Sequence, residues 1–248
     1  MALEMFGTAL NSVLTLTSPV AGIFAVLVFI SLFKKEAGKF KRPLLITFGS
    51  IALGFFLYGI AQIIYTVLDS YGLDVNASLA DVVWIAGYFL VLFGFVFFSN
   101  YIYKEKKNLL RGLSVTAIIA AAVIGILYYL ISSFIIGAQM GETEIQIFLD
   151  YLYPILSGLI FVSSLSVYFF FRGIKPFGNV IFLLAINTFI SFVGDSLWTY
   201  YTWNSIYGIS GVISDTSYLI ADVIAIIAFH KLLKITSKKV SSGGGGAR

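Results

Sequence analysis

Seven apolar stretches divide this chain, and each is long enough to cross a bilayer as a helix, which takes about 20 residues. Hydrophobic residues make up 59% of the chain and charged residues only 11%, whereas a soluble domain carries roughly 25% charged residues. The sequence therefore predicts an all-α membrane protein with one seven-helix domain over residues 1–240. The predicted membrane-spanning stretches are 11–33, 43–67, 79–103, 110–136, 146–171, 179–203 and 210–233.

Every basic residue falls in one alternate set of connections, after the first, third, fifth and seventh stretches. The opposite connections carry Asp69, Asp74, Glu142 and Glu144 and no basic residue. Because basic loops stay on the cytoplasmic side, we expect a multi-pass protein of the cell membrane with its N-terminus outside and its C-terminus cytoplasmic. The surplus of basic residues is then a topology signal that favours contact with the lipid bilayer, and nucleic acid is not an expected partner. The sixteen basic residues are Lys34, Lys35, Lys39, Lys41, Arg42, Lys104, Lys106, Lys107, Arg111, Arg172, Lys175, Lys231, Lys234, Lys238, Lys239 and Arg248.

Polar residues and prolines recur after about 134 residues, which predicts an internal repeat. Copies at about 11–103 and 146–234, joined by a linker helix at about 110–136, give a 3+1+3 arrangement around an axis near the membrane normal. The linker stretch is rich in alanine, and small residues allow close helix packing in lipid. The tail 241–248 is glycine-rich and is expected to be a flexible segment outside the fold. The matched pairs are Asp81 with Asp215, Trp84 with Tyr218, Tyr88 with Asp222, Gln62 with Asp195, Tyr65 with Trp198, Pro43 with Pro176, and Pro19 with Pro154.

The matched polar residues predict a ligand-binding cavity in the outer half of the protein. Spacings of three and four residues place the members of each set on one helical face. The second, third, sixth and seventh stretches bring these faces to similar depths, so the cavity is expected to open outward between them. The predicted ligand-binding residues are Gln62, Tyr65, Asp81, Trp84, Tyr88, Asp195, Trp198, Asp215, Tyr218 and Asp222.

Structural roles compete with binding at several of these positions. Asp81 and Asp215 could cap the starts of their helices, and Trp84 and Trp198 could belong to an interfacial aromatic belt. Asp195 and Asp222 are the strongest functional candidates, because acids inside a membrane are costly and the outer half offers no basic partner. They could be protonated, accept hydrogen bonds from neighbouring side chains such as that of Asn187, or bind a cation or a positively charged ligand beside aromatic rings.

The composition argues against several functions. The chain has no cysteine and a single histidine, and no nucleophile–base pair is evident, so we expect no enzyme. The metal content is left open. Retinal binding needs a Schiff-base lysine in the middle of the last stretch, where there is no lysine and Asp222 is the central polar residue, so no cofactor is expected. The 3+1+3 count resembles the SWEET and PQ-loop transporters, although their Pro-Gln dipeptide is absent. A small-solute or proton-coupled transporter is therefore the alternative function, and a purely structural subunit is a third.

A more specific resemblance lies in residues 78–88, which read Ser-Leu-Ala-Asp-Val-Val-Trp-Ile-Ala-Gly-Tyr. This stretch resembles the multi-span input domains of bacterial and archaeal histidine kinases and diguanylate cyclases. Residues 194–200 and 214–218 resemble the second half of that domain. The resemblance implies a membrane sensory or receptor-like protein that binds a small ligand, cation or proton and acts on a cytoplasmic signalling partner. In those proteins an output domain follows the last stretch, whereas this sequence ends there, so we expect either a stand-alone protein that signals through a partner or a sequence from which the output domain is missing.

Overall fold

The computed structural model describes residues 2–35, 42–73, 75, 77–105, 110–130, 143–172, 176–203 and 208–241. These residues form seven helices and no strand, which confirms the predicted all-α class. The predicted sites outside the described residues are Lys39, Lys41, Asp74, Lys106, Lys107, Glu142, Lys175 and the tail 242–248. The helices are α1 (Ala2–Lys35), α2 (Arg42–Ser70), α3 (Leu79–Glu105), α4 (Leu110–Leu130), α5 (Glu144–Phe171), α6 (Phe177–Trp203) and α7 (Ile209–Ser241).

Six of these helices are long and apolar enough to cross a membrane: α1, α2, α3, α5, α6 and α7. Their length and composition indicate a multi-pass membrane protein. The fourth predicted stretch gives a shorter apolar helix, Ala117–Tyr129, in the described part of the chain. Its predicted end at 131–136 lies outside the described residues.

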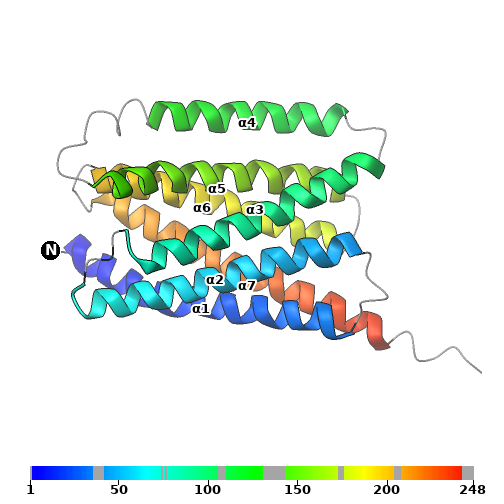
Figure 1. The fold of residues 1–248 in the computed structure, drawn as a ribbon, viewed down its shortest axis with the longest axis horizontal. Coiled ribbons are helices and arrows are strands. Elements are labelled where there is room, and N and C mark those ends of the chain that lie inside the picture. The colour runs from blue at the N-terminus through cyan, green and yellow to red at the C-terminus, as the bar shows by residue number, and fades with distance from the viewer. Residues whose placement is uncertain are drawn as a thin grey trace, which may run out of the picture.

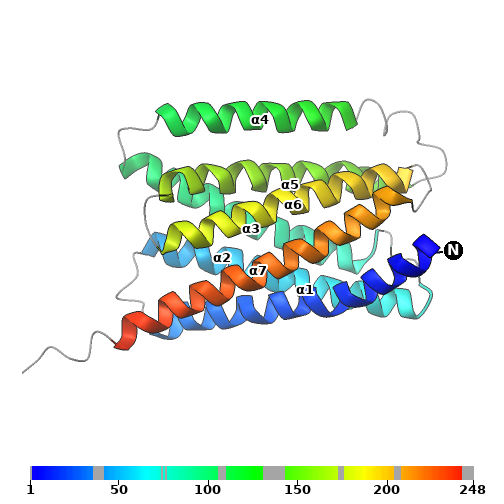
Figure 2. The ribbon, with the colours of Figure 1, turned by 180° about the vertical axis from the view of Figure 1, so that it is seen from behind.

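The six long helices form a closed ring. Around it, α1 packs against α2, α2 against α3, α3 against α5, α5 against α6, α6 against α7, and α7 returns to α1. Helix α4 lies outside this ring and packs along α5 (Figure 1). Viewed from behind, α7 runs between α1 and α6 (Figure 2). All six ring helices can therefore contribute side chains to the interior.

The linker helix is less tightly packed than its small residues predict. Ala121 and Ala122 are exposed, and Gly125 has open space around it. The buried side chain of the apolar segment is Val123, which sits over Gly158 of α5. Ala121, Ala122 and Gly125 of α4 thus face away from the ring, and the close packing predicted from the small residues is not seen at these three positions.

Glycines bring neighbouring ring helices close together. A Cβ atom on Gly54 of α2 would lie 2.8 Å from the carbonyl oxygen of Gly87 on α3. A Cβ atom on Gly59 would lie 3.1 Å from the Cα of Pro19 on α1. Such close backbone approach is how helices gain packing energy in lipid, where no hydrophobic drive acts between them. It fixes the register of α1, α2 and α3 around the interior.

One half of the ring is filled with apolar side chains. The ring centroids of Phe55 and Phe229 lie 5.1 Å apart, and those of Phe98 and Phe171 lie 5.0 Å apart. These rings belong to a single buried core that joins all six ring helices. Side chains in this core with less than 2% exposure include Phe48, Phe95, Ile181, Leu184 and Leu232. The opposite half, towards the α2–α3 connection, holds the polar residues.

Candidate functional site

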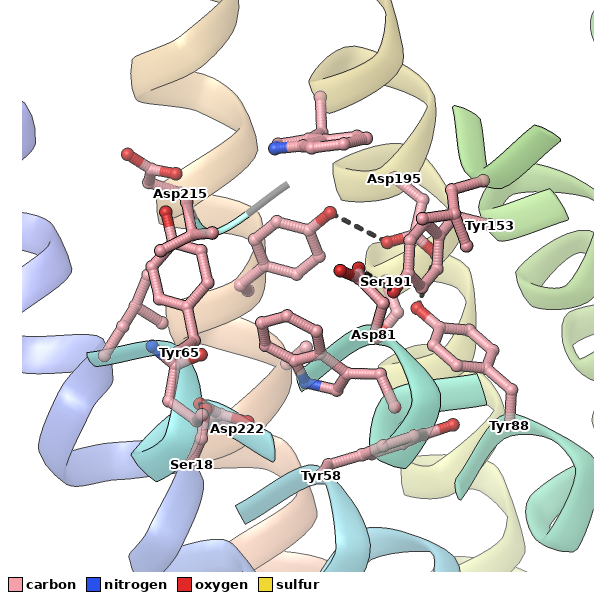
Figure 3. Close-up of a pocket in the computed structure, with 18 of the residues that line it drawn as sticks. Ser18, Tyr58, Tyr65, Asp81, Tyr88, Tyr153, Ser191, Asp195, Asp215 and Asp222 are labelled. Carbon is pink, nitrogen blue, oxygen red and sulfur yellow. Dashed lines mark hydrogen bonds between the residues drawn. The ribbon is translucent and has the colours of Figure 1, made fainter. Parts of the chain in front are cut away.

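A pocket of about 560 Å³ occupies the polar half of the ring (Figure 3). All ten residues predicted from the sequence line it, so the structure brings the whole predicted set together. The prediction placed the cavity between α2, α3, α6 and α7, whereas α1 and α5 also contribute to its wall. The lining residues that were not predicted are Asn11, Leu14, Ser18, Phe55, Tyr58, Asp69, Val75, Ala77, Gln146, Leu149, Asp150, Tyr153, Asn187, Ser191 and Ala221.

Helix α2 shows the shape of the pocket most clearly. It contributes Phe55, Tyr58, Gln62, Tyr65 and Asp69, a stripe with spacings of three and four residues. At a rise of 1.5 Å per residue this stripe covers about 20 Å of depth. Its deep end meets the apolar core, and its shallow end is the exposed Asp69. The pocket is therefore a shaft parallel to the bundle axis, with its mouth at the α2–α3 connection.

The charges around this shaft are all negative. The described lining residues include six aspartates and no lysine, arginine or histidine. Charge interactions inside a membrane protein are weakly screened, so those of these carboxyl groups that are ionised attract cations. The six are Asp69, Asp81, Asp150, Asp195, Asp215 and Asp222.

Asp195 lies on α6 with only 3% of its surface exposed. Its Oδ2 accepts a hydrogen bond from the Tyr88 hydroxyl at 2.8 Å, and its Oδ1 accepts one from the Tyr218 hydroxyl at 2.7 Å. One carboxylate therefore ties α6 to both α3 and α7. Of the sequence-based alternatives, hydrogen bonding from neighbouring side chains is realised at this acid.

Asp222 lies on α7 and is held by the neighbouring α1. Its Oδ2 accepts hydrogen bonds from the hydroxyls of Ser18 and Thr17, at 2.5 and 3.1 Å. Its Oδ1 accepts no hydrogen bond from the described part of the chain. Asn187, one of the expected partners, instead donates its Nδ2 to the carbonyl oxygen of Ala221 at 2.7 Å. Asp222 thus keeps one carboxylate oxygen for a donor in the pocket.

Asp81 has the capping role that the sequence left open for it, and it also lines the pocket. Its Oδ2 accepts the backbone N–H of Ser78 at 2.8 Å, which caps the start of α3. Its Oδ1 accepts the hydroxyl of Tyr153 on α5 at 2.5 Å. Asp215 has no capping role at the helix start, because α7 begins at Ile209 and its first turn contains no acid. The capping interpretation is therefore wrong for Asp215.

Aromatic rings lie beside these acids in two groups, Tyr65 with Trp84 and Tyr88 with Tyr153 and Trp198. Ring centroids lie 5.6 Å apart for Tyr65 and Trp84, 5.7 Å for Tyr88 and Tyr153, and 6.1 Å for Tyr153 and Trp198. Trp84 and Trp198 line the pocket as well as lying near the predicted belt. Aromatic faces attract ammonium groups, most strongly where water is excluded. In the described residues no group of three or more His, Cys, Asp or Glu residues is placed to hold a metal ion.

Four lining residues carried signals that the sequence interpretation did not use. Ser18 and Tyr153 each precede a proline of the matched pair Pro19 and Pro154, so they occupy equivalent places in the proposed copies. Tyr58 lies on the same face as Gln62 and Tyr65, one turn deeper. Asp150 lies within the fifth apolar stretch and is buried. It is therefore an acid inside a predicted membrane span, which is the property that marks Asp195.

No protein-family model, curated protein or solved structure matches this chain. Its class is therefore defined by the fold and the pocket alone. It is a multi-pass helical membrane protein whose ring of six helices is apolar at one end and lined by acids and aromatic rings at the other.

Proposed function

We propose that this chain is a sensory, receptor-like membrane protein that binds a small organic cation in the pocket. The observation that carries the proposal is the lining: six aspartates and eight aromatic residues, with no basic residue among the described ones. Ionisable groups inside a membrane are costly and normally pair with one another. Here the described lining supplies only one sign of charge, so a ligand of the opposite sign completes the site.

The pocket is proposed to face the outside of the cell. Arg42 and Arg172 are exposed at helix ends beside the apolar half, whereas Asp69 and Glu144 are exposed at the pocket end. This distribution supports a cytoplasmic position for the apolar half under the positive-inside rule. The N-terminus and the pocket mouth would then be extracytoplasmic, where a ligand from the surroundings can enter.

The 3+1+3 repeat is proposed to underlie the ring. Packing of α1 on α2 has its counterpart in α5 on α6, and packing of α3 on α5 has its counterpart in α7 on α1. Side-chain bonds join the same helix pairs, because Tyr153 of α5 donates to Asp81 of α3 and Ser18 of α1 donates to Asp222 of α7, although Asp222 matches Tyr88 and not Asp81 in the repeat. These equivalences support two copies around a central axis, with α4 as the linker outside them.

A receptor is favoured over the transport alternative by the opposite half of the ring. A transporter needs a polar route past the pocket, but the floor is formed by buried rings such as those of Phe55 and Phe229. The resemblance to kinase and cyclase input domains supports the same choice. Ligand binding would act through α3 and α7, joined at Asp195, on a cytoplasmic signalling partner. No catalytic role or cofactor is proposed.

Thermal unfolding of the purified protein tests the proposal with a cation and its neutral isostere. Choline and dimethylbutanol have nearly the same shape, and only choline carries a charge. At a concentration 100 times Kd, a ligand specific for the folded state stabilises it by about 2.7 kcal/mol. In a chain of this size the unfolding temperature rises by roughly 2–4 °C for each kcal/mol of stabilisation.

Asp222→Asn should remove the choline shift. Glu144→Gln should keep it, because Glu144 is an exposed acid at the same end that does not line the pocket. Equal shifts with choline and its neutral isostere, or no shift with any amine, would contradict the proposal.

A further inference from the structure

We infer that the ligand is a linear diammonium compound, with one ammonium group beside Asp222 and the other beside Asp215. This inference rests on the proposed function and names the class of cation. It follows from how the acids are distributed along the depth of the shaft.

Asp215 and Asp222 lie on the same face of α7, and both line the pocket. They are seven residues apart, which places them about 10 Å apart along the helix axis. Figure 3 shows them at separate levels of α7, with Tyr65 between the two levels on the same side of the pocket. One helix therefore offers an inner and an outer carboxylate along the length of the shaft.

Asp222, the deeper acid, can accept a further hydrogen bond. Oδ2 of Asp222 is taken by the hydroxyls of Ser18 and Thr17, and Oδ1 accepts nothing from the described residues. An ammonium group has three N–H donors and no acceptor, so it can bond this free oxygen and lie against nearby rings. A hydroxyl or amide ligand would bring no charge to match the carboxylate.

Between the two levels the wall is suited to a methylene chain. Tyr65 and Trp84 pack against each other here, with ring centroids 5.6 Å apart. Tyr218 lies on α7 between the two acids in sequence and also lines the pocket. Apolar ring faces between two charged levels match an α,ω-diamine, whose ends are charged and whose middle is apolar.

A compound with a single charge fits the shaft less well. A compound with one ammonium group at Asp222 does not reach the level of Asp215, and the pocket of about 560 Å³ has room for a larger molecule. Pockets of 300–1,000 Å³ typically bury a whole drug-sized ligand. A diammonium ligand that follows the shaft can place one ammonium group beside each of these two acids.

Calorimetric titration of the purified protein with two matched series tests this inference. The diamines are diaminobutane, diaminohexane and diaminooctane, and the monoamines are butylamine, hexylamine and octylamine. We expect each sufficiently long diamine to bind at least tenfold more tightly than the monoamine of equal length. The preference should rise as the nitrogen spacing approaches about 10 Å.

Two isosteric variants localise the second ammonium group. Asp215→Asn should abolish the preference for diamines, because it should lower diamine affinity at least tenfold more than monoamine affinity. Glu144→Gln, which alters an exposed acid at the same end that does not line the pocket, should keep the preference.

Equal affinity of the wild type for diamines and monoamines would overturn this inference and leave the proposed function standing. Failure of every amine to bind would overturn both. If Asp215→Asn does not fold, the chain-length series in the wild type decides alone.

Discussion

Substitution of Gly54 by alanine should separate α2 from α3 and destabilise the protein. The new Cβ would lie 2.5 Å from Val91 Cγ2 and 2.8 Å from the Gly87 carbonyl oxygen, whereas ordinary contacts begin at 3.4 Å. The carbonyl belongs to the backbone of α3, so the helices must part by about 0.6 Å, the difference between 3.4 and 2.8 Å. Overpacking of this kind costs about 1–3 kcal/mol.

A matched variant separates this packing cost from helix propensity. Alanine stabilises a helix interior by about 0.5–1 kcal/mol relative to glycine. Gly125→Ala receives that gain without a clash, because nothing lies within 4 Å of its Cβ position. The two variants should therefore differ in unfolding free energy by about 1–3 kcal/mol. Each kcal/mol of this difference separates the two unfolding temperatures by about 2–4 °C.

The same substitution should also weaken ligand binding. Gly87 supports the ring of Tyr58, which stacks on Tyr88 with centroids 5.1 Å apart, and both rings line the pocket. Parting α2 from α3 disturbs this pair, so choline should stabilise Gly54→Ala less than wild type. If Gly54→Ala and Gly125→Ala unfold at the same temperature, the close α2–α3 approach described above is refuted.

Three further outcomes are expected. Tyr153→Phe removes the hydroxyl donor to Asp81 and should lower stability by about 1.5–3 kcal/mol in chemical or thermal unfolding; an unchanged stability would mean that the bond does not form. Phe229→Ala empties a fully buried position in the apolar half and should cost about 3–5 kcal/mol, whereas a water-filled route there would make the change nearly neutral. Because the chain has no cysteine, Ser70→Cys and Asn179→Cys can be labelled singly in intact cells. Only Ser70→Cys should react with an impermeant maleimide, and the reverse pattern would invert the proposed orientation.

Much of the helical fold could be predicted because long apolar stretches in the sequence directly indicate membrane-spanning helices. The position of α4 could not, since an apolar stretch outside the ring has the same composition as one within it. Its small residues predicted close packing, yet Ala121 and Ala122 are exposed. Which helices neighbour one another depends on shape details such as Gly54 and Gly87, and these cannot be paired from one sequence.

The pocket lining could be predicted where an acid or a matched spacing marked it. Asp195 and Asp222 were singled out because charge is expensive in lipid. Tyr58 and Tyr153 were missed because tyrosine is common near membrane interfaces and its direction depends on helix rotation. The tyrosines that donate hydrogen bonds to Asp195 and Asp81 can therefore be identified only from the assembled ring.

Tryptophan fluorescence of a Trp203→Phe variant tests the central claim most directly. The chain has three tryptophans, and the two that remain, Trp84 and Trp198, both line the pocket. Titration with choline should change their emission saturably, and titration with dimethylbutanol should not. An Asp222→Asn change in the same background should abolish the choline response. A response of equal size to the neutral compound, or no response to any organic cation, would contradict an acidic aromatic pocket that binds cations.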